Sequence, residues 1–182
     1  MTAATIILRL ARPADASAIA LMSRDLIEAG LGWSYRPARI ARLILDRDTN
    51  VLIAARRGNP VGFAVMSFGD ERAHLALLAV HPAHQRQGVA RRLLEWLVEC
   101  AASAGIASLH LELRAGNAAA RAFYRDMGFA ERYVVPGYYH GRESALRMQR
   151  VLRLDEPASV RWQPPNLGAD RAADRRSRAT RR

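Results

Sequence analysis

The stretch Gln85-Arg86-Gln87-Gly88-Val89-Ala90 decides the fold, because it lies between a predicted strand and a predicted helix. The first amide groups of a helix have no partners within the helix and carry partial positive charge, so a helix start favours a phosphate group. Gly88 permits a close approach of the backbone or a positive φ, and Ala90 keeps that approach free of bulk. Arg86 and Arg91 add positive charge. From these residues alone, an ordinary turn and a phosphate-binding loop both remain open.

Regular elements flank this loop on both sides. Apolar residues at helical spacing predict a helix over 89–104, which Gly105 ends. Residues 74–80 and 108–114 are predicted strands, and the strand–helix–strand order predicts that they lie parallel. The apolar stripe expected to face the core consists of Val89, Leu93, Trp96, Leu97, Cys100 and Ala104.

The rest of the chain adds strands on either side of this unit. Short turns connect the strands at 50–56, 61–68 and 74–80, which predicts an antiparallel meander. The other expected strands are 5–10, 129–135 and 144–154. The other expected helices begin near Pro13 and after Pro37 and cover 117–127. Together they predict an α/β (α+β) domain over 1–154, with a mixed sheet of about seven strands and about four helices.

Length and composition limit the other possibilities. The 182 residues suit one domain, and half of them are hydrophobic. The single cysteine, Cys100, excludes an internal disulfide and a Cys-rich metal site, and its place on the apolar stripe favours a core role over an acyl carrier. No apolar run is long enough for a membrane span and no signal peptide is recognised, so a cytoplasmic protein is expected. His81, His84 and His140 show no metal-ligand spacing, so no metal is expected.

The formal net charge is +11, and all of the positively charged side chains that contribute to it are arginines, because the chain has no lysine. Such a charge favours anionic partners, namely a nucleotide cofactor, RNA or a ribonucleoprotein surface, although a bias toward arginine without functional meaning remains open. Residues 155–182 are polar, rich in proline and arginine, and aperiodic, which predicts a disordered tail. A weak RNA or ribosome contact through this tail and a merely solvated end both remain open.

Three motifs resemble the GNAT superfamily of N-acetyltransferases. The stretch 85–90 resembles its motif A, with Ala90 at the last position, and 78–82 resembles the strand end and proline-containing loop before it. Asn117, Tyr124 and Gly128-Phe129 are similar to the pattern of the next helix. The motifs cover 74–135, and the topology extends the likeness to 5–154. The resemblance implies a splayed sheet with acetyl-CoA between the strand ends near Val80 and Arg114. The cofactor-binding residues it implies are Leu78, Ala79, Val80, Gln85, Arg86, Gln87, Gly88, Val89, Ala90 and Asn117.

Within the superfamily, the chain is similar to the ribosomal-protein-alanine N-acetyltransferases. The stretch 111–117, the pair Trp33-Ser34 and the segment 137–145 carry this likeness, with Gly137 in place of asparagine and Ser144 in place of aspartate. The resemblance implies direct acetyl transfer to a primary amine, with a protein N-terminal α-amine, first that of ribosomal protein alanine, as the acceptor. A small-molecule amine acceptor and a non-catalytic CoA-sensing or RNA-associated module remain as alternatives.

The resemblance also assigns chemical roles. In the strand 108–114, Glu112 shares a face with His110 and Arg114, opposite the leucines. The pattern alone favours a solvated face of the strand. The family likeness implies instead that Glu112 is a general base, acting directly or through a water. Tyr124 is a core aromatic by its spacing and a proton donor to the leaving thiolate by the likeness. Backbone amides near 79–81 are expected to polarise the thioester carbonyl. The aromatic residues expected to line the acceptor groove, with ordinary loop packing as the alternative, are Trp33, Tyr35, Tyr138 and Tyr139.

Overall fold

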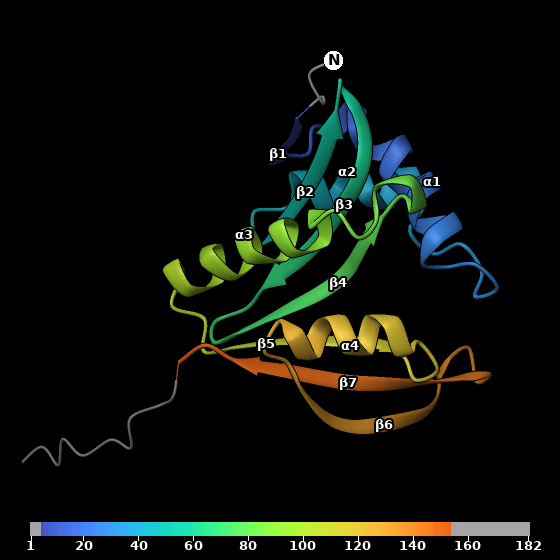
Figure 1. Cartoon of the computed structure of the whole chain (residues 1–182), viewed down its shortest axis with the longest axis vertical. Coiled ribbons are helices and arrows are strands. Elements are labelled where there is room, and N and C mark those ends of the chain that lie inside the picture. Colours follow the sequence, from blue (N-terminus) through green and yellow to red (C-terminus); the bar gives the residue numbers. More distant parts are fainter. Residues whose placement is uncertain (1–4, 154–182) are drawn as a thin grey trace, which may run out of the picture.

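A computed structural model of the chain describes residues 5–153. The predicted tail at 155–182 and the outermost residues of the predicted domain lie outside the described residues. The strands form one seven-stranded sheet in the order β1-β2-β3-β4-β5-β7-β6, antiparallel except for the parallel pair β4 and β5 (Figure 1). This confirms the predicted mixed sheet. The strands are β1 (Ile6–Leu10), β2 (Thr49–Arg56), β3 (Asn59–Phe68), β4 (Arg72–Val80), β5 (Ser108–Arg114), β6 (Ala130–Tyr139) and β7 (Glu143–Val151).

Helices cover both faces of the sheet. The α-helices are α1 (Ala16–Leu26), α2 (Pro37–Leu45), α3 (Val89–Ser103) and α4 (Ala118–Asp126), with short 3₁₀ turns at Pro13–Asp15 and Pro82–His84. One apolar cluster joins α1 and α2 to one face of β2, β3 and β4. A larger cluster joins α3 and α4 to the opposite face and continues under β5 and β7 (Figure 1).

The buried stripe of α3 differs in part from the predicted one. Val89, Leu93 and Leu97 are buried as expected, but the stripe continues through Leu94 and Ala101. Positions four apart lie on one face of a helix, so Leu93, Leu97 and Ala101 align while Cys100 is turned toward the side. Cys100 is therefore half-buried rather than part of the core.

The two halves of the sheet separate between β4 and β5. These strands pair only from Arg72 to His74, opposite Ser108 to His110, whereas β3 pairs with β4 and β7 pairs with β5 along nearly their whole lengths. Beyond His74 and His110 the strands diverge, which produces the V between β4 and β5 that is visible in Figure 1 above α4. The splayed sheet implied by the family resemblance is thus present.

A β-bulge in β4 lies just inside this opening. Leu75 is opposite Met66 and Leu77 is opposite Val65, so Ala76 is the extra residue. A bulge shifts the alternation of side chains along a strand. Leu75 accordingly packs on the α3 side of the sheet, while Leu77 packs on the α1 side.

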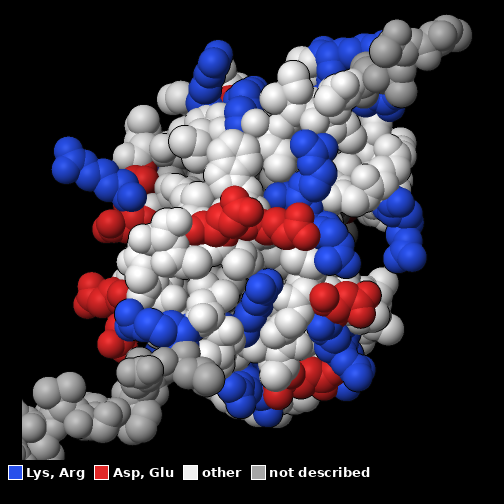
Figure 2. All heavy atoms as spheres, turned by 60° about the vertical axis from the view of Figure 1, so that its left-hand side comes forward, with Lys and Arg blue, Asp and Glu red and all other residues white. Residues whose placement is uncertain are grey.

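The charge of the molecule is spread rather than concentrated on the face shown in Figure 2. Basic side chains there are separated by uncharged surface, and acidic side chains form a band between them. In residues 5–153, no helix is long and apolar enough to cross a membrane.

Candidate active site

The predicted phosphate-binding loop forms the start of α3. Gly88 is the N-cap residue with φ of 78°, and a side chain built on it would meet no atom within 4 Å. No side chain caps the start of α3. The Arg92 amide donates to the Gly88 carbonyl, which is the first hydrogen bond of the helix. The amides of the first turn are therefore available to an anion. This is the chemistry that the pyrophosphate of acetyl-CoA requires.

Side chains of the same loop attach it to the sheet. The Gln85 amide donates to the carbonyl of Val80 at 2.9 Å, and the Gln87 amide donates to that of Ala83 at 3.1 Å. Arg86 and Gln87 are exposed, whereas the Val89 side chain is buried in the core, so only the backbone of Val89 faces the loop. The loop is thereby held against the end of β4.

Three small cavities follow one another from this loop into the V. The first, of about 240 Å³, is lined by five of the predicted cofactor residues and by Tyr124. The second, of about 280 Å³, shares Leu78 and Tyr124 with the first and adds Asn117 and Glu112. The third, of about 260 Å³, shares Glu112 and Tyr139 with the second. The cofactor residues lining the first cavity are Leu78, Ala79, Val80, Gln85 and Ala90.

The middle cavity brings Glu112 and Tyr124 together. Tyr124 is buried, and its ring packs edge-on against Phe123 and Phe129 at centroid separations of 5.2 and 5.6 Å. Burial raises the pKa of the Tyr124 phenol far above its ordinary value. Asn117, on the same cavity, caps α4 by accepting a hydrogen bond from the Ala120 amide at 3.0 Å.

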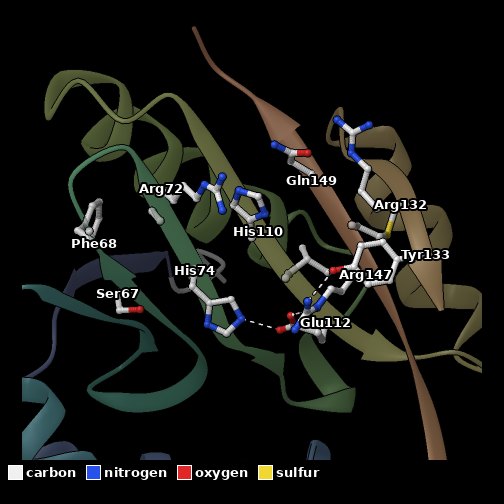
Figure 3. A pocket seen from close by; sticks show the side chains of 14 residues that line it. Ser67, Phe68, Arg72, His74, His110, Glu112, Arg132, Tyr133, Arg147 and Gln149 are labelled. Atoms are coloured by element: carbon white, nitrogen blue, oxygen red, sulfur yellow. Dashed lines mark hydrogen bonds and ion pairs between the residues drawn. The ribbon is translucent and has the colours of Figure 1, made fainter. Parts of the chain in front are cut away.

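Glu112 is held by two cationic or potentially cationic side chains from neighbouring strands. Oε2 lies 2.6 Å from His74 Nε2, and Oε1 accepts a hydrogen bond from Arg147 Nε at 2.8 Å (Figure 3). These two bonds, with His74 the larger influence, hold the pKa of the Glu112 carboxyl below its ordinary value despite partial burial. Arg147 is itself fixed by Tyr133, whose hydroxyl lies 2.7 Å from its Nη1.

The third cavity contains three of the four predicted acceptor residues, namely Tyr35, Tyr138 and Tyr139. Burial, followed by the nearby Tyr138 and Glu112, raises the pKa of Tyr139 to about 12. Trp33 is not among the residues lining this cavity. Its indole instead lies between Arg24 and Arg36 and packs on the α1–α2 cluster.

Two charged side chains to which the sequence analysis gave no role at the acceptor cavity hold one of its walls. Buried Glu28 accepts hydrogen bonds from the amides of Ser34 and Tyr35, and so fixes the segment after α1. Arg114, at the end of β5, donates to the Ile27 carbonyl at 3.1 Å and pairs with Glu143 at 3.3 Å. The partners of Arg114 lie 87 and 29 residues away along the chain, so no short motif could have indicated them. The partners of Glu28 lie only six and seven residues away.

The backbone donors expected near 79–81 are only partly available. The His81 amide donates to the Val61 carbonyl at 2.8 Å, so it cannot polarise a thioester. Hydrogen-bonded and non-hydrogen-bonded pairs alternate in an antiparallel ladder, and Val80 is opposite Gly62 in the next pair. The Val80 amide therefore faces away from β3, toward the opening. In residues 5–153, no cluster of three or more His, Cys, Asp or Glu side chains is arranged to hold a metal ion.

Comparison with known proteins agrees with this geometry. A model of the acetyltransferase (GNAT) family matches residues 20–129. The chain belongs to the GNAT family of acetyltransferases. The predicted family, fold, enzyme class and acetyl-CoA cosubstrate are thus confirmed at the level of the family.

Individual relatives indicate a narrower likeness. The [ribosomal protein bS18]-alanine N-acetyltransferase of Escherichia coli K12 is 42% identical over 96 residues, which are 51% of this chain and 65% of that protein. The chain thus matches slightly less than two thirds of the length of this relative. The crystal structure of the Escherichia coli ribosomal-protein-S18-alanine N-acetyltransferase has a TM-score of 0.73 at 29% identity, covering 85% of this chain and 98% of that one. The Salmonella typhimurium protein yncA, solved with its cofactor acetyl-CoA, shares the fold with a TM-score of 0.71 at 24% identity, covering 82% and 95%.

Proposed function

We propose that this protein moves the acetyl group of acetyl-CoA directly to the α-amine at the N-terminus of another protein. A ribosomal protein beginning with alanine is the first candidate, because the relative from Escherichia coli bears that activity in its name. Such an acceptor would place the reaction in the cytoplasm. The observation that carries the proposal is the row of three cavities, with Glu112 and Tyr124 in the middle one.

The two residues suit the two proton transfers of the reaction. An attacking amine must lose a proton, and Glu112 supplies a carboxylate on the acceptor side of the middle cavity. The leaving thiolate must gain a proton. Since burial raises the pKa of Tyr124, its phenol keeps its proton throughout the physiological range and is available to the sulfur. Glu112 is the candidate base and Tyr124 the candidate acid.

The acceptor side favours a peptide over a small amine. The cavity with Tyr35, Tyr138 and Tyr139 shares His74 and Glu112 with a much larger cavity of about 870 Å³. An acceptor whose amine lies at Glu112 therefore has room to continue beyond it. Arg114 and Glu28 hold the segment after α1, which forms one wall, so this entrance is prearranged for an extended chain.

The test is acetyl-CoA-dependent thiol release on an Ala-starting peptide, on the same peptide with a blocked N-terminus, and on a polyamine and free amino acids. We expect turnover on the free peptide only. Glu112→Gln and Tyr124→Phe should each lower kcat by about 10²–10⁴-fold, with binding of CoA retained. Glu131→Gln is the matched control, because Glu131, in β6, pairs with Arg121 of α4 and lines none of the three cavities. Turnover confined to small amines would contradict the peptide acceptor, and full activity of Glu112→Gln would contradict the assigned base.

A further inference from the structure

His74 stands beside the candidate base in an arrangement that the proposed roles leave unused. It comes from β4, two residues before the bulge at Ala76, and reaches across the point where β4 and β5 separate. Its Nε2 is 2.6 Å from Glu112 Oε2. Figure 3 shows the ring beside the carboxylate, with its other nitrogen directed away from Glu112.

The carboxylate of Glu112 is poorly suited to be the final proton acceptor. Arg147 donates to one of its oxygens and His74 contacts the other, and both contacts favour the ionised form. Its pKa is held below the ordinary carboxyl value. A protein α-amino group has an ordinary pKa of about 7.7–8.0, so transfer of its proton to this carboxylate is strongly uphill.

The imidazole of His74 has the complementary properties. An ionised carboxylate only accepts hydrogen bonds, so the 2.6 Å contact requires the proton on Nε2. Nδ1 of the neutral ring then carries a free lone pair. Among residues 5–153 we find no hydrogen bond to Nδ1 of His74. A carboxylate that fixes the tautomer of a histidine and stabilises its charged form is a recurrent arrangement for general bases.

The position of His74 gives it access to both sides. It lines the acceptor cavity with Tyr35 and Tyr139, and it also lines the open cavity of about 870 Å³. Its side chain is 44% exposed. A proton taken from an amine in the acceptor cavity can therefore leave to solvent through the cavity of about 870 Å³.

We propose that His74 accepts the proton of the acceptor ammonium, while Glu112 orients the imidazole and stabilises its charged form. This inference rests on the proposed acetyl transfer and divides the role of the base between two residues. One N–H bond of the ammonium breaks and an Nδ1–H bond forms on His74. The neutral amine then attacks the thioester carbonyl, so that a C–N bond forms and the C–S bond breaks with the thiolate as leaving group. The nitrogen then loses a second proton, which replaces the one that Tyr124 gives to the sulfur. His74 finally releases its proton to solvent, so one ammonium and one thioester give one amide, one thiol and one proton.

Other charged and titratable groups line the two cavities around His74. Burial, followed by the positive charge of Arg72, lowers the pKa of His110. This favours the neutral form of His110, while Glu112 supplies a negative charge 2.6 Å from His74. The titratable and charged groups that line the two cavities with His74 are Glu28, Tyr35, Arg39, Arg72, His110, Glu112, Arg132, Tyr133, Tyr138, Tyr139, His140 and Arg147.

The test compares His74→Gln with His110→Gln. Glutamine at 74 can still donate a hydrogen bond to Glu112 but cannot accept the proton, and His110 is a second histidine on the same sheet face, bonded to Ser108 instead. We expect His74→Gln to lower kcat/KM on an Ala-starting peptide by about 10²-fold or more at pH 7. The loss should shrink as the pH is raised past the pKa of the acceptor amine, since the amine then arrives neutral. His110→Gln should keep the wild-type profile.

A second variant separates chemistry from structure. His74→Ala should regain activity when free imidazole is added, and the Kd for CoA should equal that of the wild type. A wild-type pH profile for His74→Gln would overturn the inference, as would a loss that is constant from pH 6 to 9.5 without rescue by imidazole. Absence of turnover by the wild type on every amine would instead overturn the proposed function itself.

Discussion

Gly88→Ala separates the role of the loop before α3 from the general stability of the fold. Gly88 has φ of 78° with open space around it, so an alanine there meets no neighbouring atom and only the backbone conformation is penalised. A left-handed conformation costs an L-residue about 1–2 kcal/mol. If the loop keeps its shape, the free energy of unfolding falls by that amount, which corresponds to a decrease in Tm of about 2–8 °C for a domain of this size. If the loop relaxes instead, the first amides of α3 move away from the phosphate position.

Gly58→Ala is the matched control, because Gly58 has φ of 82°, equally open surroundings and a place in the β2–β3 turn. Both variants are compared by thermal unfolding and by calorimetric titration with CoA. We expect similar losses of Tm. Only Gly88→Ala should bind CoA more weakly, by about 5–30-fold if the 1–2 kcal/mol appears in binding.

Equal CoA affinity of Gly88→Ala and the wild type would refute the reasoning that places the pyrophosphate on this helix start. Equal weakening in both variants would refute it too, because the effect would then follow stability rather than the position of the loop amides.

Three further predictions concern other parts of the site and the core. The pKa of Glu112 is lowered in the folded state, so its contribution to stability is complete above the ordinary carboxyl value of 4.5 and is lost as the pH falls through the lowered pKa. Denaturant titrations should therefore show that the difference in unfolding free energy between wild type and Glu112→Gln shrinks from pH 6 to pH 3. A difference that stays constant would contradict this. Leu97→Ala, at a fully buried position of α3, should cost about 2–5 kcal/mol in urea unfolding, and a loss well below this range would mean that the site collapses around the cavity. Arg114→Gln removes the bonds to the Ile27 carbonyl and to Glu143, so it should raise KM for the peptide. The increase is about tenfold if peptide binding loses 1.4 kcal/mol. An unchanged KM would argue against a role of Arg114 in this wall of the acceptor cavity.

Local signals made much of the fold and part of the site predictable. The helical stripe of α3 and the two-residue period of β5 indicated both elements and placed Glu112 opposite the buried leucines. The cap at Asn117 was predictable for the same reason, since a cap involves residues only three apart. The family motifs then indicated which of several polar side chains to favour.

The environment of Glu112 was not predictable in this way. His74 and Arg147 are 38 and 35 residues away along the chain, and they meet Glu112 only because of the strand order and register. No local pattern specifies register, and a single-residue shift would turn each side chain to the other face. The bulge at Ala76 is a further example, because a plain alternation through β4 would put Leu75 and Leu77 on the same face.

The short pairing between β4 and β5 has a consequence for how the molecule opens. Three residue pairs hold this seam, from Arg72 to His74, whereas β3 pairs with β4, apart from the bulge at Ala76, and β5 pairs with β7 along nearly their whole lengths. Those amide hydrogens of β4 beyond His74 and of β5 beyond His110 that face this seam thus lack a cross-strand partner. Local opening is expected to begin there at a lower free energy than global unfolding. A cosubstrate bound in the V would act as the missing cross-connection, so its binding should slow hydrogen exchange most along these two strand ends.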